Sequence, residues 1–203
     1  MEEGAVNMHT NALIIFVRNP VLGKVKTRIA EAAGEVTALK VYKELLRHTH
    51  DITLGVGADK FVFYSNHPEL NDCWEDNLYI KNIQQGNSLG EKMKDSFEKM
   101  FIAGYKHICI IGSDCYELTT AIIQSAFTAL DKNDAVIGPA SDGGYYLLGL
   151  TRMIPYVFAN KEWSTDSVYM ATITDLRNAG CNYEVLPLLN DVDRMEDVPS
   201  ILK

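Results

Sequence analysis

Basic side chains are concentrated in one short segment of this 203-residue sequence. Arg18, Lys24, Lys26 and Arg28 follow an apolar run, and residues 11–30 contain these four basic residues and no acidic one. The whole chain has a formal net charge of −8, so the segment reverses the sign of its surroundings. Lysine and arginine side chains, together with backbone amides of a turn, can hold phosphate oxygens. We therefore expect a phosphate-binding loop, with a solvated basic turn as the alternative.

Asp114 is the first candidate metal ligand. It follows the apolar run 107–111 and a glycine, so its carboxylate should project beyond the end of a buried strand. Magnesium prefers oxygen ligands and commonly uses one or two carboxylates together with phosphate oxygens and waters. A metal site is therefore one prediction for this loop. The alternative is that Asp114 caps the following helix, whose apolar positions begin at Leu118.

Two later loops also contain aspartates. Asp142 precedes Gly143 and Gly144, which would let the backbone approach a ligand closely, although a hairpin turn has the same composition. Asp191 and Asp193 are two residues apart, so in an extended segment their carboxylates point to the same side. Such neighbours need a cation or an arginine between them. A second metal contact and a cap on a C-terminal helix are both consistent with this pattern.

Strands that alternate with helices should position these loops. Ser88 and Glu91 have the spacing of a capping box at the start of one helix. Continuous apolar runs predict strands, and apolar positions at helical spacing predict helices. The predicted strands are residues 12–17, 60–64, 78–83, 107–111, 135–137, 145–148 and 183–186, and the predicted helices cover 36–49, 89–100, 118–130 and 165–179.

This alternation predicts an α/β fold, organised as a single domain over residues 11–203 after an irregular start at 1–10. The sheet should be mostly parallel, with helices on both faces. Ligands of such sheets bind beyond the carboxyl ends of the strands. The four polar loops all belong to that edge.

Composition excludes several classes of partner. An acidic chain with no basic cluster beyond this one short segment is a poor candidate for binding nucleic acid. The longest apolar runs are far shorter than the roughly 20 residues of a membrane helix, so we expect no membrane span. The four cysteines have no metal-binding spacing and no signal peptide is apparent, which predicts a cytoplasmic protein with reduced thiols. The oligomeric state, a homo-oligomer included, is left open.

Five motifs in order resemble bacterial glycosyltransferase-like proteins of the nucleotide-diphospho-sugar transferase superfamily, which have the Rossmann-related GT-A fold. The motifs are residues 16–28, 111–115, 138–149, 163–168 and 191–193. The sequence departs from the family pattern at Tyr116, where proline is usual, and at Arg194 and Met195, which replace threonine and proline.

The resemblance implies a nucleotide or nucleotide-sugar ligand at the end of the first strand. Arg18, Lys24, Lys26 and Arg28 would then lie near its phosphates. Asp114 would occupy the place of the metal-binding aspartate of a DxD-type motif. Asp142, Gly143 and Gly144 would line the sugar or acceptor side.

The preferred hypothesis is a metal-dependent glycosyltransferase that uses a nucleotide-diphosphate sugar. Asp114 and Asp193 would hold Mg²⁺ or Mn²⁺ at the leaving diphosphate, and Asp142 would act as the general base on the acceptor hydroxyl. The first alternative is a guanylyltransferase-like nucleotidyltransferase that releases pyrophosphate, because the superfamily includes such enzymes. The second is a catalytically idle nucleotide-binding domain.

Overall fold

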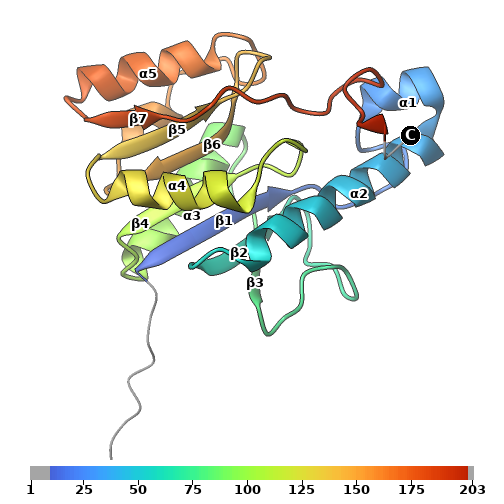
Figure 1. Ribbon diagram of the computed structural model, residues 1–203, viewed down its shortest axis with the longest axis horizontal. Helices are drawn as coiled ribbons and strands as arrows, with labels where there is room; N and C mark the ends of the chain where they lie inside the picture. Colours follow the sequence, from blue (N-terminus) through green and yellow to red (C-terminus); the bar gives the residue numbers. More distant parts are fainter. Residues whose placement is uncertain (1–9, 201–203) are drawn as a thin grey trace, which may run out of the picture.

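A seven-stranded sheet forms the centre of the computed structural model, which describes residues 10–200 (Figure 1). The strand order is β3-β2-β1-β4-β6-β5-β7, and β6 alone runs antiparallel to its neighbours β4 and β5. The predicted α/β class and mostly parallel sheet are confirmed. The expected irregular start lies, apart from Thr10, outside the described residues. The strands are β1 (Asn11–Val17), β2 (Asp59–Tyr64), β3 (Tyr79–Ile83), β4 (His107–Ile111), β5 (Ala135–Pro139), β6 (Tyr145–Leu150) and β7 (Tyr183–Val185).

Helices cover both faces of the sheet. Residues of α2 and α4 pack in one apolar cluster with one face of the strands, and residues of α3, α5 and the short 3₁₀ helix η1 pack on the other. The helices are α1 (Thr27–Ala33), α2 (Glu35–Leu54), α3 (Leu89–Ile102), α4 (Thr120–Leu130), η1 (Pro155–Phe158) and α5 (Val168–Asn178).

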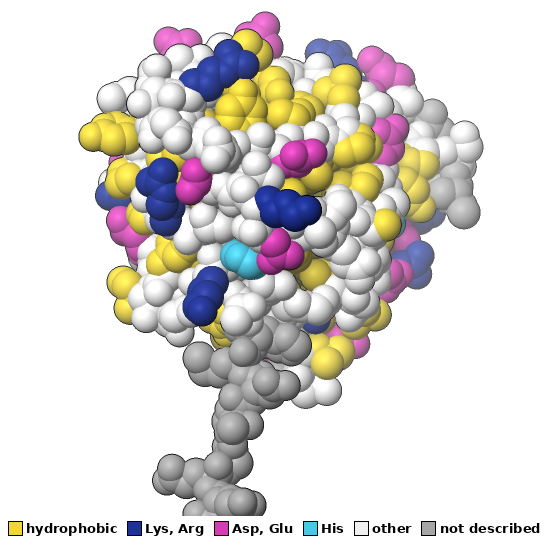
Figure 2. Space-filling view, turned by 60° about the vertical axis from the view of Figure 1, so that its left-hand side comes forward, with side chains coloured by type: hydrophobic (Ala, Val, Ile, Leu, Met, Phe, Trp, Pro, Cys, Tyr) yellow, Lys and Arg dark blue, Asp and Glu magenta, His cyan; other side chains and the backbone are white. Residues whose placement is uncertain are grey.

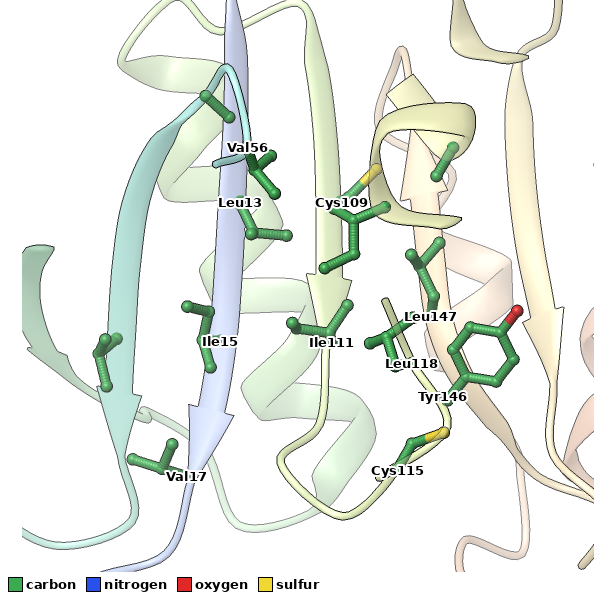
Figure 3. Packing of buried hydrophobic residues seen from close by; sticks show 14 of the residues in the cluster. Leu13, Ile15, Val17, Val56, Cys109, Ile111, Cys115, Leu118, Tyr146 and Leu147 are labelled. Carbon is green, nitrogen blue, oxygen red and sulfur yellow. The ribbon is translucent and has the colours of Figure 1, made fainter. Parts of the chain in front are cut away.

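β1 shows why its sequence is apolar throughout. Leu13 and Ile15 belong to the cluster beneath α2 and α4, whereas Ile14 belongs to the cluster on the other face. All three side chains are fully buried, as expected for a strand covered on both sides. Figure 3 shows Leu13 and Ile15 in one layer with Ile111 of β4, beside Leu118 and Tyr146.

A third apolar cluster fixes the C-terminal segment. Val192 and Val198 pack against Ile29 of α1 and against Val41 and Leu45 of α2. In Figure 1 the segment, drawn in red, leaves β7 and runs across the molecule to α1. The cluster therefore brings the aspartates flanking Val192 next to the basic segment near the N-terminus.

The turn between β5 and β6 is a hairpin, as one of the two sequence interpretations proposed. The Ala140 amide donates to the Gly144 carbonyl at 3.0 Å, and the two strands pair antiparallel. Asp142 lies in this turn. The apolar run of β6 predicted its burial but not its direction, because a strand covered on both faces looks the same in either orientation.

Helix caps differ from the sequence expectations in detail. The Ser88 hydroxyl accepts the Glu91 amide at 3.2 Å, but the Glu91 carboxylate accepts the Asn87 amide rather than that of Ser88, so only half of the capping box forms. Thr119 caps α4, and the Asp114 alternative is wrong. Helix α5 begins at Val168, three residues later than expected.

No α-helix begins in the described part of the predicted C-terminal helix, residues 197–200. Residues 195–197 form a turn, in which the Asp197 carboxylate accepts the amides of Asp193 and Arg194 at 3.2 and 2.7 Å. Asp191 and Asp193 therefore do not cap a helix within residues 10–200. This leaves the metal interpretation of these two aspartates in place.

The face of the molecule in Figure 2 carries both acidic and basic side chains. Acidic and basic side chains are interspersed on that face, and neither sign dominates it. No helix within residues 10–200 is both long and apolar enough to span a membrane.

Candidate active site

Tyr42 of α2 joins the loops that follow β1 and β4. Its hydroxyl accepts the Arg18 amide at 2.8 Å and donates to the Arg18 carbonyl at 3.0 Å. The same oxygen lies 3.5 Å from the Ser113 hydroxyl. Burial, reinforced by the charge of Asp114, raises the pKa of Tyr42 above its ordinary value, so the phenol stays neutral. The helix thereby contacts the Arg18 backbone after β1 and the Ser113 side chain after β4.

Asn19 fixes the loop after β2 to the loop after β1. It is 3% exposed, and its side-chain oxygen accepts the Ser65 hydroxyl at 3.1 Å and the Asn66 amide at 3.0 Å. Its side-chain nitrogen donates to the His67 carbonyl and the Glu69 carboxylate, both at 2.8 Å. Every hydrogen-bonding group of this buried amide is satisfied, which makes the junction rigid.

Lys26 reaches from the basic loop to the loop after β4. Its ammonium lies 2.9 Å from Asp114 Oδ1, and its side chain is 7% exposed, against 48% for Asp114. Its backbone adopts φ 48° and ψ 50°, the left-handed region that non-glycine residues rarely occupy. The surrounding loop therefore holds Lys26 in an unfavourable conformation that directs its ammonium onto Asp114.

The C-terminal segment closes the site from the other side. The Val192 amide donates to the Asp114 carbonyl at 2.8 Å, which places Asp191 and Asp193 on either side of this contact. Arg28 of α1 forms an ion pair with Asp193. Residues from three distant parts of the sequence thus meet at the carboxyl end of β4.

Asp191 is the carboxylate most strongly affected by this arrangement. Burial, together with the charges of Asp114, Asp142 and Asp193, raises its pKa from 3.8 to about 7, while Lys26 opposes the change. Four carboxylates and one ammonium therefore act as a single electrostatic group. Asp191 is thus electrostatically coupled to Asp114, Asp142 and Asp193, whose functional roles stay predictions.

The start of α5 holds the Asp142 turn. Asp142 Oδ1 accepts the Gly144 amide at 2.8 Å, and Gly143 has φ +87°. A Cβ at Gly143 would lie 2.2 Å from the Asp166 carbonyl oxygen, and the Tyr169 amide donates to the Gly143 carbonyl at 2.9 Å. Only glycine fits this position, so the turn needs Gly143 for its geometry.

The four basic residues do not form one cradle. Lys26 and Arg28 pair with carboxylates, whereas Arg18 and Lys24 are exposed and make no ion pair among residues 10–200. Cys115 is buried, and burial raises the pKa of its thiol to about 12, which excludes a thiolate nucleophile at neutral pH.

Oxygen ligands for a hard cation are present at this edge of the sheet. Asp114, Asp191 and Asp193 offer carboxylates, the donor type that Mg²⁺ and Mn²⁺ prefer. Within the described part of the chain, no three histidine, cysteine or acidic side chains form a preformed metal cluster. The donor set fits a cation held by one or two carboxylates and completed by phosphate oxygens and waters.

Sequence reasoning gave little weight to three residues of this site. Tyr42 follows the buried stripe of α2 and carried no sign that its hydroxyl binds a loop. Asn19 was one polar residue in a turn. The importance of Asp191 depends on its electrostatic coupling to Asp114 and Asp142, which are distant from it in sequence.

Comparisons with known proteins agree with this architecture. Residues 51–165 match the model of a family described as "Uncharacterized protein conserved in bacteria (DUF2064)". A solved structure from Desulfovibrio desulfuricans G20, provisionally identified as a nucleotide-diphospho-sugar transferase, is 33% identical, covers 92% of this chain and 84% of its own, and has a TM-score of 0.85. A comparison with proteins of curated function returned no match.

More distant structures share the fold. The inositol-1-phosphate CTP transferase from T. maritima is 14% identical, covers 96% of this chain and 93% of its own, and has a TM-score of 0.60. Rv0371C from Mycobacterium tuberculosis H37Rv, solved in complex with manganese, is 10% identical, covers 94% and 96%, and has a TM-score of 0.52. Family match, identity and fold together establish that this chain belongs to the bacterial DUF2064 family and has the nucleotide-diphospho-sugar transferase fold.

Proposed function

We propose that this protein transfers a sugar from a nucleotide-diphosphate sugar to an acceptor hydroxyl. The observation that carries the proposal is the ion pair of Lys26 with Asp114 beside the half-buried Asp191. A diphosphate leaving group needs cations, and a cation bound to it needs carboxylates, so both kinds of charge must meet in one place. The relative from D. desulfuricans, provisionally assigned to this class, supports the same reading.

The basic residues would bind the diphosphate. Arg18 and Lys24 are exposed at the end of β1, where their charges are available to a ligand. Arg28 is exposed as well, and its pair with Asp193 is a surface contact that a phosphate can replace. These residues would stabilise the negative charge that develops on the diphosphate as its bond to the sugar breaks.

A divalent cation would complete the site. Asp114 and Asp193 are the proposed ligands, and Asp191 is a further one because it lies within the same electrostatic group. Bound Mg²⁺ or Mn²⁺ would act as a Lewis acid on the leaving diphosphate. Manganese in the Rv0371C structure is consistent with this proposal.

Asp142 is the proposed general base. Its Oδ1 is fixed by the Gly144 amide, which orients the exposed carboxylate in the hairpin turn. A carboxylate in that position can accept the proton of the acceptor hydroxyl as the new bond forms. Gly143 and Gly144 would lie on the sugar or acceptor side.

Nucleotidyl transfer is the second candidate. The T. maritima CTP transferase shares the fold over 96% of this chain. Its reaction type would use the same basic loop and the same carboxylates but would start from a nucleoside triphosphate. The two reactions differ in their products: a nucleoside diphosphate from the first, pyrophosphate from the second.

A ligand panel with product detection tests the proposal. Melting temperature is measured with nucleoside di- and triphosphates and sugar nucleotides, each with and without Mn²⁺, because a bound ligand stabilises the folded state. Ligands that bind are then assayed for release of nucleoside diphosphate or pyrophosphate. Stabilisation by sugar nucleotides and nucleoside diphosphate release are the expected results. If no nucleotide stabilises the protein under either condition, the proposal is wrong.

The metal assignment has its own test. Asp114→Asn should abolish the Mn²⁺ dependence of nucleotide binding. Asp131→Asn is the matched control, because Asp131 lies 3.7 Å from His107 at the amino end of β4, away from the site. Unchanged Mn²⁺ dependence in Asp114→Asn would exclude Asp114 as a ligand.

A further inference from the structure

The Lys26 ammonium contacts Asp114, the carboxylate that we propose as a ligand of the divalent cation. Its ammonium is 2.9 Å from Asp114 Oδ1, and its side chain is almost completely removed from solvent. A lysine ammonium buried in this way is costly unless negative charge surrounds it. Here the compensating charge comes from the carboxylates that we assign to the cation.

The balance of charge around Lys26 explains this position. Asp114 and Asp142 both act on Asp191, and Lys26 is the basic group that offsets them there. Arg28 pairs with Asp193 instead, and Lys24 is exposed without an ion pair among residues 10–200. Lys26 therefore supplies the positive charge on which the carboxylate group depends in the ligand-free protein.

The backbone conformation shows that this contact is held under constraint. Lys26 is one of four non-glycine residues with positive φ within residues 10–200, and it immediately precedes α1. Its neighbour Val25 is 2% exposed, which anchors the chain before it, and the buried Ile29 anchors the chain after it. Because the backbone is anchored on both sides of Lys26, its side chain can change direction without a movement of the loop.

We propose that Lys26 is a tethered counter-ion that competes with a divalent cation for Asp114 and moves to phosphate when a diphosphate ligand enters. The metal and the diphosphate then each raise the affinity of the protein for the other, because both favour separation of the Lys26–Asp114 ion pair. The metal displaces the ammonium from Asp114, and the diphosphate gives the ammonium a new anionic partner. The inference rests on the proposed function and adds which partner Lys26 has before and after the ligands bind.

A purely structural role for Lys26 makes a different prediction. If the ion pair with Asp114 only holds two loops together, its removal should weaken the binding of metal and of diphosphate alike. A competing counter-ion has effects of opposite sign: its removal strengthens binding of the metal alone and weakens binding of the diphosphate. The two roles are therefore separable by binding measurements without any assay of activity.

Isothermal titration calorimetry on the full chain tests this inference with Mn²⁺ and pyrophosphate as probes. Each is titrated alone and in the presence of the other, and the results are corrected for the Mn²⁺–pyrophosphate complex that forms in buffer. In the parent protein we expect each probe to raise the affinity for the other by the same factor, about tenfold, since coupling of binding is reciprocal. Equal affinities with and without the second probe would overturn the inference.

The variants Lys26→Met and Lys24→Met separate the specific effect from the loss of one positive charge. Lys26→Met should bind Mn²⁺ alone about tenfold more tightly and pyrophosphate alone more weakly, with the coupling reduced. Lys24→Met should leave the affinity for Mn²⁺ alone nearly unchanged. Unchanged or weaker Mn²⁺ binding by folded Lys26→Met contradicts the inference; if that variant does not fold, Lys26→Gln and the coupling in the parent protein decide the question.

The outcomes also distinguish this inference from the proposed function. If Mn²⁺ and pyrophosphate bind the parent protein independently, the counter-ion role is wrong and the proposed transferase site remains. If Mn²⁺ fails to bind even with pyrophosphate present, the proposed metal site is wrong and the inference falls with it.

Discussion

Asp191 gives the site a measurable dependence on pH. Its folded-state pKa of about 7 lies above its ordinary value of 3.8, so the folded protein holds this proton more tightly than the unfolded chain. The free energy of unfolding should therefore decrease as the pH rises from about 4 to about 7, and the loss should persist above pH 7. Buried carboxylates crowded by like charges behave in this way.

Asp191→Asn should remove that loss. Without divalent cations, we expect the variant to be more stable than the parent at pH 8, by on the order of 1–2 kcal/mol, and nearly equal at pH 4. Urea unfolding at the two pH values measures the difference. A variant that is less stable than the parent at pH 8 would show that the Asp191 charge is compensated in the folded protein.

Tyr42 is a residue whose hydroxyl alone can be tested. Tyr42→Phe keeps the ring in the core but leaves the Arg18 amide and carbonyl without their partner. We expect a loss of about 1–2 kcal/mol in the free energy of unfolding, the usual cost of an unpaired buried group. Because the Arg18 and Ser113 loops would also loosen, affinity for Mn²⁺ with pyrophosphate should fall.

Tyr79→Phe is the matched control for this prediction. Tyr79 is equally buried, and its hydroxyl bonds to the Thr53 hydroxyl at 2.9 Å and the His50 carbonyl at 3.3 Å, in a different part of the core. Its loss of stability should be similar, with ligand affinity unchanged. Equal ligand affinities for the two variants would mean that Tyr42 does not position the site.

At the scale of elements, the hairpin between β5 and β6 makes the clearest prediction. Gly143→Ala places a Cβ 2.2 Å from the Asp166 carbonyl oxygen at a residue with φ +87°. The turn or the start of α5 must shift, so we expect a loss of at least about 2 kcal/mol and a displaced Asp142. Gly57→Ala is the control, since its Cβ meets nothing within 4 Å; a Gly143→Ala protein as stable as this control would contradict the argument.

The elements also show how far sequence patterns reach. Apolar runs predicted the strands, because a strand that is buried on both faces needs apolar side chains at successive positions. β1 is an example. The same signal carries no direction, so the antiparallel orientation of β6 followed only from the hairpin interpretation of the Asp142 turn, one of two that its composition allowed. Polar residues after the strands indicated the candidate site, whose function stays a prediction. The raised pKa of Asp191 was not predictable, because it depends on the charges of Asp114 and Asp142, which are distant in sequence.

The whole molecule combines a net charge of −8 with a framework that pairs opposite charges at one edge of the sheet, where Lys26 contacts Asp114 and Arg28 contacts Asp193. Three apolar clusters account for the packing of the strands and helices, and the four cysteines, Cys73, Cys109, Cys115 and Cys181, are free. No disulfide joins any of these four cysteines, so apolar packing is what connects the elements of the framework within residues 10–200. We propose that the site binds a cation, since the four carboxylates of Asp114, Asp142, Asp191 and Asp193 outnumber the basic groups of Lys26 and Arg28 that pair with them.

Removal of divalent cations should therefore separate fold from function. In EDTA the melting temperature of the ligand-free protein should stay within about 1 °C of its value in buffer alone, because a fold without a structural metal has nothing to lose. Stabilisation by a sugar nucleotide should disappear in EDTA and return when Mn²⁺ is added in excess. Differential scanning fluorimetry measures both quantities in one series. A large decrease of the ligand-free melting temperature would show that a metal holds the fold, and stabilisation by the nucleotide that persists in EDTA would show that the basic loop binds phosphate without a bridging cation.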